Sequence, residues 1–205
     1  MSGFSLDGGK ATVHYEGSFI SVQSVGYRDP EGQAHQRDIV RHPGAVVIVP
    51  YVEETGSVLF IEQYRVAIDR ALIELPAGKR DIDGESPEEC ARRELEEEIG
   101  VKSQSMVFLA KFFNSPGFTD EETYVFLARG LSSGEHNPQG VEEASARRRS
   151  ARLAGLEDLV STGTLNDAKS IIGMYAARSY LENLNIPETF DDDIDLDGFA
   201  PVEPG

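Results

Sequence analysis

A strongly capped, glutamate-rich helix is the feature that most constrains how this chain can fold. Ser86, Pro87 and Glu89 form a Ser-Pro-x-Glu pattern, in which the serine and glutamate side chains cap the first turn of a helix. The helix is predicted to run through Ile99. Gly100 can then take the left-handed conformation that ends a helix.

Strand-like segments surround this helix. Residues 11–41 carry β-type patterning with a turn at Asp29-Pro-Glu-Gly32, which predicts two or three strands. The run Ala45–Val52 is typical of a strand buried on both faces. Further strands are expected at 57–65, 72–75, 107–113, 123–131 and 144–153, and helices at 156–161 and 167–184, the second with an apolar stripe at 171, 172, 175 and 176. Strands and helices without strict alternation favour an α+β fold, with a mixed sheet between outer helices.

Three regions are expected along the 205 residues. The first, 1–40, is a small β-strand region and a candidate dimerisation element. The second, 41–184, is the main domain, and 40% apolar residues overall suffice for a sizeable core. The third, 185–205, is acidic and contains three prolines, which is typical of a flexible tail.

The charge balance restricts the partners. With 36 acidic and 19 basic residues, the net charge is −17, which repels nucleic acids and anionic membranes. An anionic substrate would therefore need local cations. The single cysteine, Cys90, excludes an intrachain disulfide and is interpreted as a small helix residue rather than a nucleophile. Residues 1–10 lack the apolar segment of a secretion signal, so we expect a cytoplasmic protein.

Three glutamates share one face of the capped helix. Glu94, Glu97 and Glu98 stand at positions i, i+3 and i+4. Carboxylates this close repel one another unless a positive charge intervenes, and a cluster of oxygen ligands suits Mg²⁺ or Mn²⁺. Such a cluster can support phosphoryl chemistry with two or more metal ions. A solvated acidic face is the alternative, because glutamate-rich helices are common.

The residues around these glutamates resemble a known motif. Gly78, Glu85 and the run Arg93-Glu-Leu-Glu-Glu-Glu-Ile-Gly-Val101 are similar to the Nudix box, Gly-x5-Glu-x7-Arg-Glu-U-x-Glu-Glu-x-Gly-U, where U is aliphatic. Every defined position from Glu85 onward matches. Six residues instead of five separate Gly78 from Glu85, and the extra residue falls in the loop before the helix.

This resemblance implies a fold and a set of roles. The fold would be the Nudix α/β/α sandwich. Glu94, Glu97, Glu98 and the backbone carbonyl of Ala77 would bind two or more Mg²⁺ ions, with Mn²⁺ as a substitute. Glu98 would thereby be catalytic, and Arg93 would support catalysis by holding the glutamates in position.

Flanking segments look like the ADP-ribose pyrophosphatase branch of the family. Pro116 lies sixteen residues past Gly100, at the position of the branch's proline marker. The other similar segments are Arg41-His-Pro-Gly-Ala45, Glu62-Gln-Tyr-Arg65, Leu75-Pro-Ala-Gly78, Ser115-Pro-Gly-Phe-Thr-Asp-Glu121 and Asp167-Ala-Lys169.

The branch resemblance suggests how a substrate would be held. Arginine guanidinium groups could donate to phosphates or stack on adenine, and a polar loop could bind the terminal ribose. The candidate substrate-binding residues are Arg41, Arg65, Ser115, Pro116, Gly117 and Glu121. Arg65 could equally be an edge charge, and Ser115 a turn residue. Phe19 and Tyr27 could stack on adenine across a homodimer, although ordinary packing is the more common role of such aromatics.

The implied reaction is attack of a metal-activated water on the pyrophosphate of ADP-ribose, which gives AMP and ribose 5-phosphate. Glu142 and Glu143 are candidates for the general base or for a solvated loop pair, and Glu135 is a weaker candidate. Two alternatives stay open at this point. One is a Nudix enzyme for another nucleoside diphosphate derivative, such as a GDP-sugar or a dinucleoside polyphosphate. The other is a non-catalytic Nudix-fold binding module, in which loss of box glutamates would be expected.

Overall fold

The computed structural model describes residues 3–9, 11–137 and 144–184. Its strands are β1 (Ser5–Leu6), β2 (Thr12–Glu16), β3 (Ser21–Arg28), β4 (Ala34–Arg41), β5 (Ala45–Val52), β6 (Ser57–Arg65), β7 (Arg70–Glu74), β8 (Ala77–Lys79), β9 (Val101–Phe113), β10 (Glu122–Ser133) and β11 (Arg147–Arg152). The α-helices are α1 (Pro87–Ile99), α3 (Leu156–Ser161) and α4 (Ala168–Asn183). None of these helices is long and apolar enough to cross a membrane.

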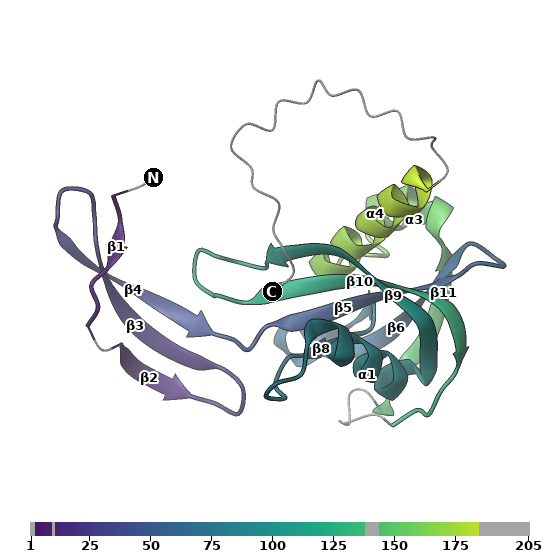
Figure 1. Ribbon diagram of the computed structural model, residues 1–205, viewed down its shortest axis with the longest axis horizontal. Helices are drawn as coiled ribbons and strands as arrows, with labels where there is room; N and C mark the ends of the chain where they lie inside the picture. The colour runs from purple at the N-terminus through teal and green to yellow at the C-terminus, as the bar shows by residue number, and fades with distance from the viewer. Residues whose placement is uncertain (1–2, 10, 138–143, 185–205) are drawn as a thin grey trace, which may run out of the picture.

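The main body is the α/β/α sandwich that the sequence predicts. A seven-stranded sheet runs in the order β11-β6-β5-β10-β9, with β7 paired to β6 and β8 paired to β5. The pairing of β5 with β10 is parallel, whereas β5 pairs antiparallel with β6 and β8, so the sheet is mixed. Helix α1 covers one face, and α3 and α4 cover the other (Figure 1).

Strand β5 lies between two cores. Val47 and Val49 pack in the cluster under α3 and α4, whereas Val46 and Ile48 pack in the cluster under α1. All four side chains are fully buried, which confirms the prediction for Ala45–Val52. Successive side chains of a strand point to opposite faces, so a strand between two helical layers has to be apolar throughout.

The first four strands form a separate sheet. Strand β3 pairs with β1 and β2 on one edge and with β4 on the other, and Figure 1 shows this sheet beside the main body, joined to it through β4. The predicted turn at 29–32 is present, since Gly32 donates its N–H to the carbonyl of Asp29. Strand β1 was missed because its two residues carry no readable pattern.

The capping of α1 is confirmed in detail. The Oγ of Ser86 accepts a hydrogen bond from the backbone N–H of Glu89, and the carboxylate of Glu89 accepts one from the N–H of Ser86. Gly100 ends the helix with φ of 56°, in the left-handed region. Local interactions therefore fix both ends of this helix, through side chains at its start and through the backbone of Gly100 at its end.

The apolar stripe predicted for α4 is wrong. The buried residues of this helix are Ser170, Gly173, Met174 and Ala177, whereas Ile172 and Tyr175 are exposed. A Cβ added at Gly173 would lie 2.7 Å from Cδ1 of Leu75 and 3.3 Å from Cγ2 of Val49. A small residue therefore lies at position 173 because α4 packs too closely there for a side chain, a distance that sequence periodicity does not encode.

Two strand predictions also differ from the structure. No strand was predicted between 75 and 107, but Ala77–Lys79 form β8 and pair with β5. Strand β9 begins at Val101 instead of 107 and pairs with β10 along almost its whole length. Its first half alternates polar residues with few apolar ones, so partner pairing and not hydrophobic patterning makes it a strand.

Enlarging Gly173 is expected to destabilise the fold. In Gly173→Val the new side chain would push α4 away from β5 and β7, which should cost about 1–3 kcal/mol of unfolding free energy. Ser179→Val, on the exposed face of the same helix, controls for helix propensity and should stay close to the parent. Urea unfolding of both variants measures the difference, and equal stability would show that α4 is not closely packed at Gly173.

Candidate active site

Helix α1 presents its glutamates at the junction with β8. Its apolar side, with Ala91, Leu95 and Ile99, packs into the core under the sheet. Glu94 and Glu98 are also largely buried, with 8% and 6% of their surface exposed. Burial of carboxylates is unfavourable unless charges or hydrogen bonds compensate, so this face is not the solvated acidic surface that the sequence left open.

Gly78 allows the helix to approach the sheet. A Cβ built on Gly78 would lie 1.8 Å from Cδ of Glu94, so every other residue would collide with that carboxylate. The neighbouring backbone N–H of Ala77 donates a hydrogen bond to Oε2 of Glu98 at 2.9 Å. Strand β8 therefore holds two of the three box glutamates, one through close contact and one through a hydrogen bond.

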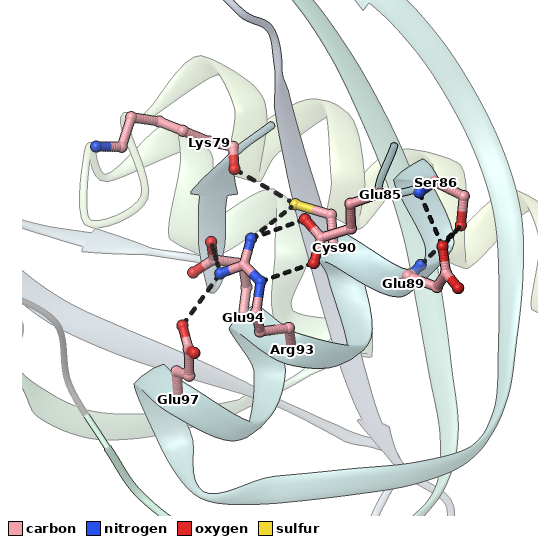
Figure 2. Close-up of polar contacts among 8 residues, drawn as sticks. All are labelled: Lys79, Glu85, Ser86, Glu89, Cys90, Arg93, Glu94 and Glu97. Atoms are coloured by element: carbon pink, nitrogen blue, oxygen red, sulfur yellow. Dashed lines mark hydrogen bonds and ion pairs between the residues drawn. The ribbon is translucent and has the colours of Figure 1, made fainter. Parts of the chain in front are cut away.

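Arg93 organises the carboxylates on the exposed side of α1. Its Nε and Nη2 donate to the two oxygens of Glu85 at 2.8 and 2.9 Å, while Nη1 donates to Glu94 at 2.7 Å and to Glu97 at 3.1 Å. Figure 2 shows the guanidinium lying between these three side chains. The hydrogen bond from Arg93 lowers the pKa of Glu85, and the same bond is the main cause that raises the pKa of Arg93. This geometry agrees with the positioning role that the family resemblance implies for Arg93.

The extra residue before the helix does not displace Glu85. A turn closes through the N–H of Glu85 and the carbonyl of Ile82, with Gly84 at a φ of 81°. A positive φ suits glycine, which lacks a Cβ, and this allows the chain to reverse within the longer loop. The loop absorbs the insertion, and Glu85 keeps its bidentate contact with Arg93.

The glutamate cluster fits a divalent cation in charge and in donor type. Three carboxylates, those of Glu85, Glu94 and Glu97, share the guanidinium of Arg93, and the carboxylate of Glu98 is held by the N–H of Ala77, so the acids outnumber this cation. Within the part of the chain that the structure describes, no three acidic, histidine or cysteine side chains already surround one point. Nη1 of Arg93 holds Glu94 and Glu97, so metal binding would require these two side chains to turn.

Arg65 lies at the end of β6, in contact with a buried acid. Its Nε and Nη2 donate to the two oxygens of Glu74, both at 2.6 Å. This hydrogen bonding raises the pKa of Arg65 despite its partial burial, and the charges of Glu74, Asp167 and Glu98 act in the same direction. Arg65 is therefore a fixed cation within electrostatic range of Glu98, and not a free edge charge.

The loop between β9 and β10 docks on the end of β4. The N–H of Val40 donates to the carbonyl of Phe118 at 2.7 Å, and Nη1 of Arg41 donates to Asp120 at 2.9 Å. The carboxylate of Glu121 lies 3.9 Å from Nδ1 of His42. The carbonyl of Ser115 accepts two backbone N–H groups, so this residue forms the turn. The predicted substrate-binding residues of this region thus come together, with Pro116 and Gly117 exposed at the tip of the loop.

A neighbouring cavity brings Phe19 and Arg41, which the sequence analysis named as candidate substrate contacts, together with His42, which it did not assign to a site. It has a volume of about 320 Å³ and is lined by residues 16–21 and 41–43. In its wall the ring of Phe19 meets that of His42 edge-on at 5.6 Å, and Nζ of Lys79 lies 4.7 Å from the Phe19 centroid. Lys79 follows the box glycine directly, but only pairing of β8 with β5 brings it to this cavity. Tyr27 instead stacks on His35, away from this cavity.

The remaining candidates from the sequence are three glutamates and the single cysteine. Glu142 and Glu143 lie outside the described residues. Glu135 is exposed, and its backbone N–H donates to Glu96 on α1. Cys90 is buried, and burial raises the pKa of its thiol to about 12, so it is a core residue and not a nucleophile at neutral pH.

Substituting Gly78 is expected to damage the site more than the fold. In Gly78→Ala the methyl group would displace the carboxylate of Glu94, so the affinity for Mn²⁺ should fall about tenfold or more. Isothermal titration calorimetry measures this affinity, and thermal unfolding measures the stability of the variant. Gly155→Ala is the matched control, because a Cβ there meets nothing within 4 Å. Unchanged Mn²⁺ affinity in Gly78→Ala would show that Glu94 is not a ligand.

The sequence of this chain is similar to those of known proteins. The family model described as the NUDIX domain matches residues 40–172, more than half of the chain. The chain is 40% identical over 129 residues to the methanol dehydrogenase activator of Bacillus methanolicus, which covers 63% of this chain and 68% of that protein. It is 36% identical over 156 residues to the ADP-ribose pyrophosphatase of Bacillus subtilis, which covers 76% and 83%.

A third relative and a solved structure extend the similarity. The ADP-ribose pyrophosphatase of Mycobacterium tuberculosis is 32% identical over 180 residues, which covers 88% of this chain and 86% of that protein. Proteins named GDP-mannose pyrophosphatase match at 28–30% identity. A crystal structure of an ADP compounds hydrolase has the same fold, with a TM-score of 0.73 at 24% identity over 88% of this chain and 97% of that one. The chain therefore belongs to the Nudix family and is a Nudix hydrolase.

Proposed function

We propose that this Nudix pyrophosphatase hydrolyses ADP-ribose to AMP and ribose 5-phosphate, in a reaction that depends on Mg²⁺ or Mn²⁺. The observation that carries the proposal is the cluster of Glu94, Glu97 and Glu98, packed on Gly78 and ordered by Arg93. The choice of ADP-ribose draws on the two relatives named ADP-ribose pyrophosphatase, both above 30% identity.

In this proposal the box residues hold the metal ions. The carboxylates of Glu94, Glu97 and Glu98 and the carbonyl of Ala77 would be the ligands of two or more ions. Bound Mg²⁺ supplies a water of lowered pKa and neutralises charge that develops on the phosphate oxygens. Arg93 would retain Glu85 as its bidentate partner when Glu94 and Glu97 turn to the ions, so the helix face keeps one fixed cation.

Other residues would bind and orient the substrate. Arg65 donates through Nε and Nη2 to Glu74, which leaves Nη1 for a phosphate oxygen. Ser115 and Glu121 would hydrogen-bond the terminal ribose, with Arg41 close by on β4. Glu142 or Glu143 would accept the proton of the attacking water.

A GDP-sugar is the second candidate substrate. The observation in its favour is the similarity to proteins named GDP-mannose pyrophosphatase, which is lower than that to the ADP-ribose pyrophosphatases. In this proposal the box glutamates hold the metal ions at the pyrophosphate, which both substrates contain, so they would not discriminate between the two. The non-catalytic alternative is disfavoured, because all three box glutamates are present and ordered.

A metal-dependent activity panel tests the proposal. With Mg²⁺, the protein should release AMP from ADP-ribose faster than it cleaves GDP-mannose, NADH or diadenosine polyphosphates, and EDTA should abolish the activity. Loss of a metal ligand in Glu98→Gln should lower kcat/KM at least about 100-fold. The matched control is Glu88→Gln, at an exposed residue of the same helix that pairs with Arg92, and it should keep full activity.

The outcomes separate the alternatives. Faster turnover of another compound would retain the chemistry and reject ADP-ribose as the substrate. Full activity in Glu98→Gln would reject the assigned metal site. A folded protein that binds Mg²⁺ but turns over nothing would favour the binding-module alternative.

We also propose that the chain is a homodimer assembled through its first sheet. Leu6, Val13 and Tyr15 of this sheet are 74%, 51% and 57% exposed. Exposed apolar surface of this kind is typical of a protein–protein interface. A second copy would bury this surface. The cavity beside Phe19 lies at the edge of the same sheet, so dimerisation would also shape the substrate site.

Light scattering coupled to size-exclusion chromatography tests this assembly. The parent should elute with the mass of two chains, and Val13→Asp should shift the population toward one chain, because a charge would be buried at the interface. Leu184→Asp, at an exposed position outside this sheet, should leave the mass unchanged. A parent protein with the mass of one chain would refute the proposal.

A further inference from the structure

A buried carboxylate outside the Nudix box pairs with Arg65, one of the candidate substrate-binding residues. Glu74, the last residue of β7, is only 1% exposed. It contacts two cations from distant parts of the chain, Arg65 on β6 and Lys169 on α4. Burial on its own would raise the pKa of Glu74, but the hydrogen bonds and charges of these two cations outweigh it, so the net shift is downward. Glu74 is therefore a buried anion.

The first turn of α4 holds Glu74 in place. Asp167, the N-cap of this helix, accepts hydrogen bonds from Nζ of Lys169 at 2.9 Å and from Oγ of Ser170 at 2.5 Å. The same Oγ accepts the backbone N–H of Leu75 at 2.8 Å. The first turn of α4 thus fixes two consecutive residues that lie 95 positions earlier in the sequence. It holds Glu74 by its side chain and Leu75 by its backbone.

The charges of this network balance. Arg65 and Lys169 are cations, and Glu74 and Asp167 are anions, so the four groups sum to zero. A buried ion network of this kind is weak support for stability, because apolar residues of similar volume are often at least as stabilising. Its geometry instead restricts the side chain of Arg65, which keeps 40% of its surface exposed and lies within electrostatic range of Glu98.

We infer that Glu74, clamped by Lys169 and Asp167, is a positioning residue that sets the guanidinium of Arg65 for the pyrophosphate of the substrate; this inference rests on the proposed function. Glu74 occupies Nε and Nη2, so the remaining donors of Arg65 have one orientation instead of many. Fixing a donor before the substrate binds removes the cost of ordering it in the transition state. Helix α4 thereby contributes to catalysis without contacting the substrate.

A double-mutant cycle on Glu74 and Arg65 tests the inference. Glu74→Gln, Arg65→Gln and the double variant are compared with the parent, using the nucleotide compound that the parent hydrolyses fastest. Each single variant should lower kcat/KM about 10- to 100-fold, and the double variant should be no worse than Arg65→Gln alone. Glu74→Asp, which keeps the charge, should recover part of the loss.

Glu62→Gln is the matched control for the cycle. Glu62 lies on the same strand as Arg65 and pairs with an arginine, Arg149, but 31% of its side chain is exposed. This variant should have the kcat and KM of the parent. Thermal unfolding of every variant measures the loss of stability, and kinetics measured at a temperature where every variant is folded then report the loss of positioning alone.

Two results would overturn the inference. One is a double variant whose losses multiply, which would show that Glu74 acts independently of Arg65. The other is parental kinetics in Glu74→Gln with only a lower melting temperature, which would leave the network a purely structural role. The four proteins are also titrated with methylene-bridged ADP-ribose, which is not hydrolysed. If the parent turns over nothing, the proposed hydrolysis fails, and the inference survives only if binding of this probe shows the same non-additive pattern.

Discussion

The close approach of α1 to β8 is the constraint on which the site depends. The helix can lie this near the sheet only because residue 78 has no side chain, and the carboxylate of Glu94 occupies the space that a Cβ would fill. The same approach brings Glu98 to the N–H of Ala77. Two buried carboxylates are thus placed beside backbone polar groups, at a point where a phosphate-bound cation would have ligands from both the helix and the strand.

Burial of so many acids is tolerated because cations are distributed among them. Arg93 neutralises part of the box cluster, and Arg65 with Lys169 neutralises Glu74 at the end of β7. In a chain with net charge −17, these local cations decide where an anionic substrate can approach. The structure therefore combines a glutamate-rich helix face with an arginine held within electrostatic range of Glu98.

Local sequence signals predicted the parts of the fold that depend on local interactions. The limits of α1 follow from its capping box and Gly100, and the buried position of β5 follows from an unbroken apolar run. The predictions failed where a distant partner decides the structure. Strand β8 exists because residues 77–79 pair with β5, and α4 has a glycine at position 173 because Leu75 and Val49 lie so near it.

The sequence by itself determined the family, through the Nudix box. It also determined that Glu94, Glu97 and Glu98 share one face and that Arg93 lies one turn from Glu97, because helical spacing places these residues without reference to the rest of the chain. Only the tertiary structure decided that Glu74 and Lys169 meet Arg65, and that Lys79 and His42 meet Phe19. These contacts join residues from separate strands and helices, and their geometry depends on how the sheet and helices pack, which no local pattern records.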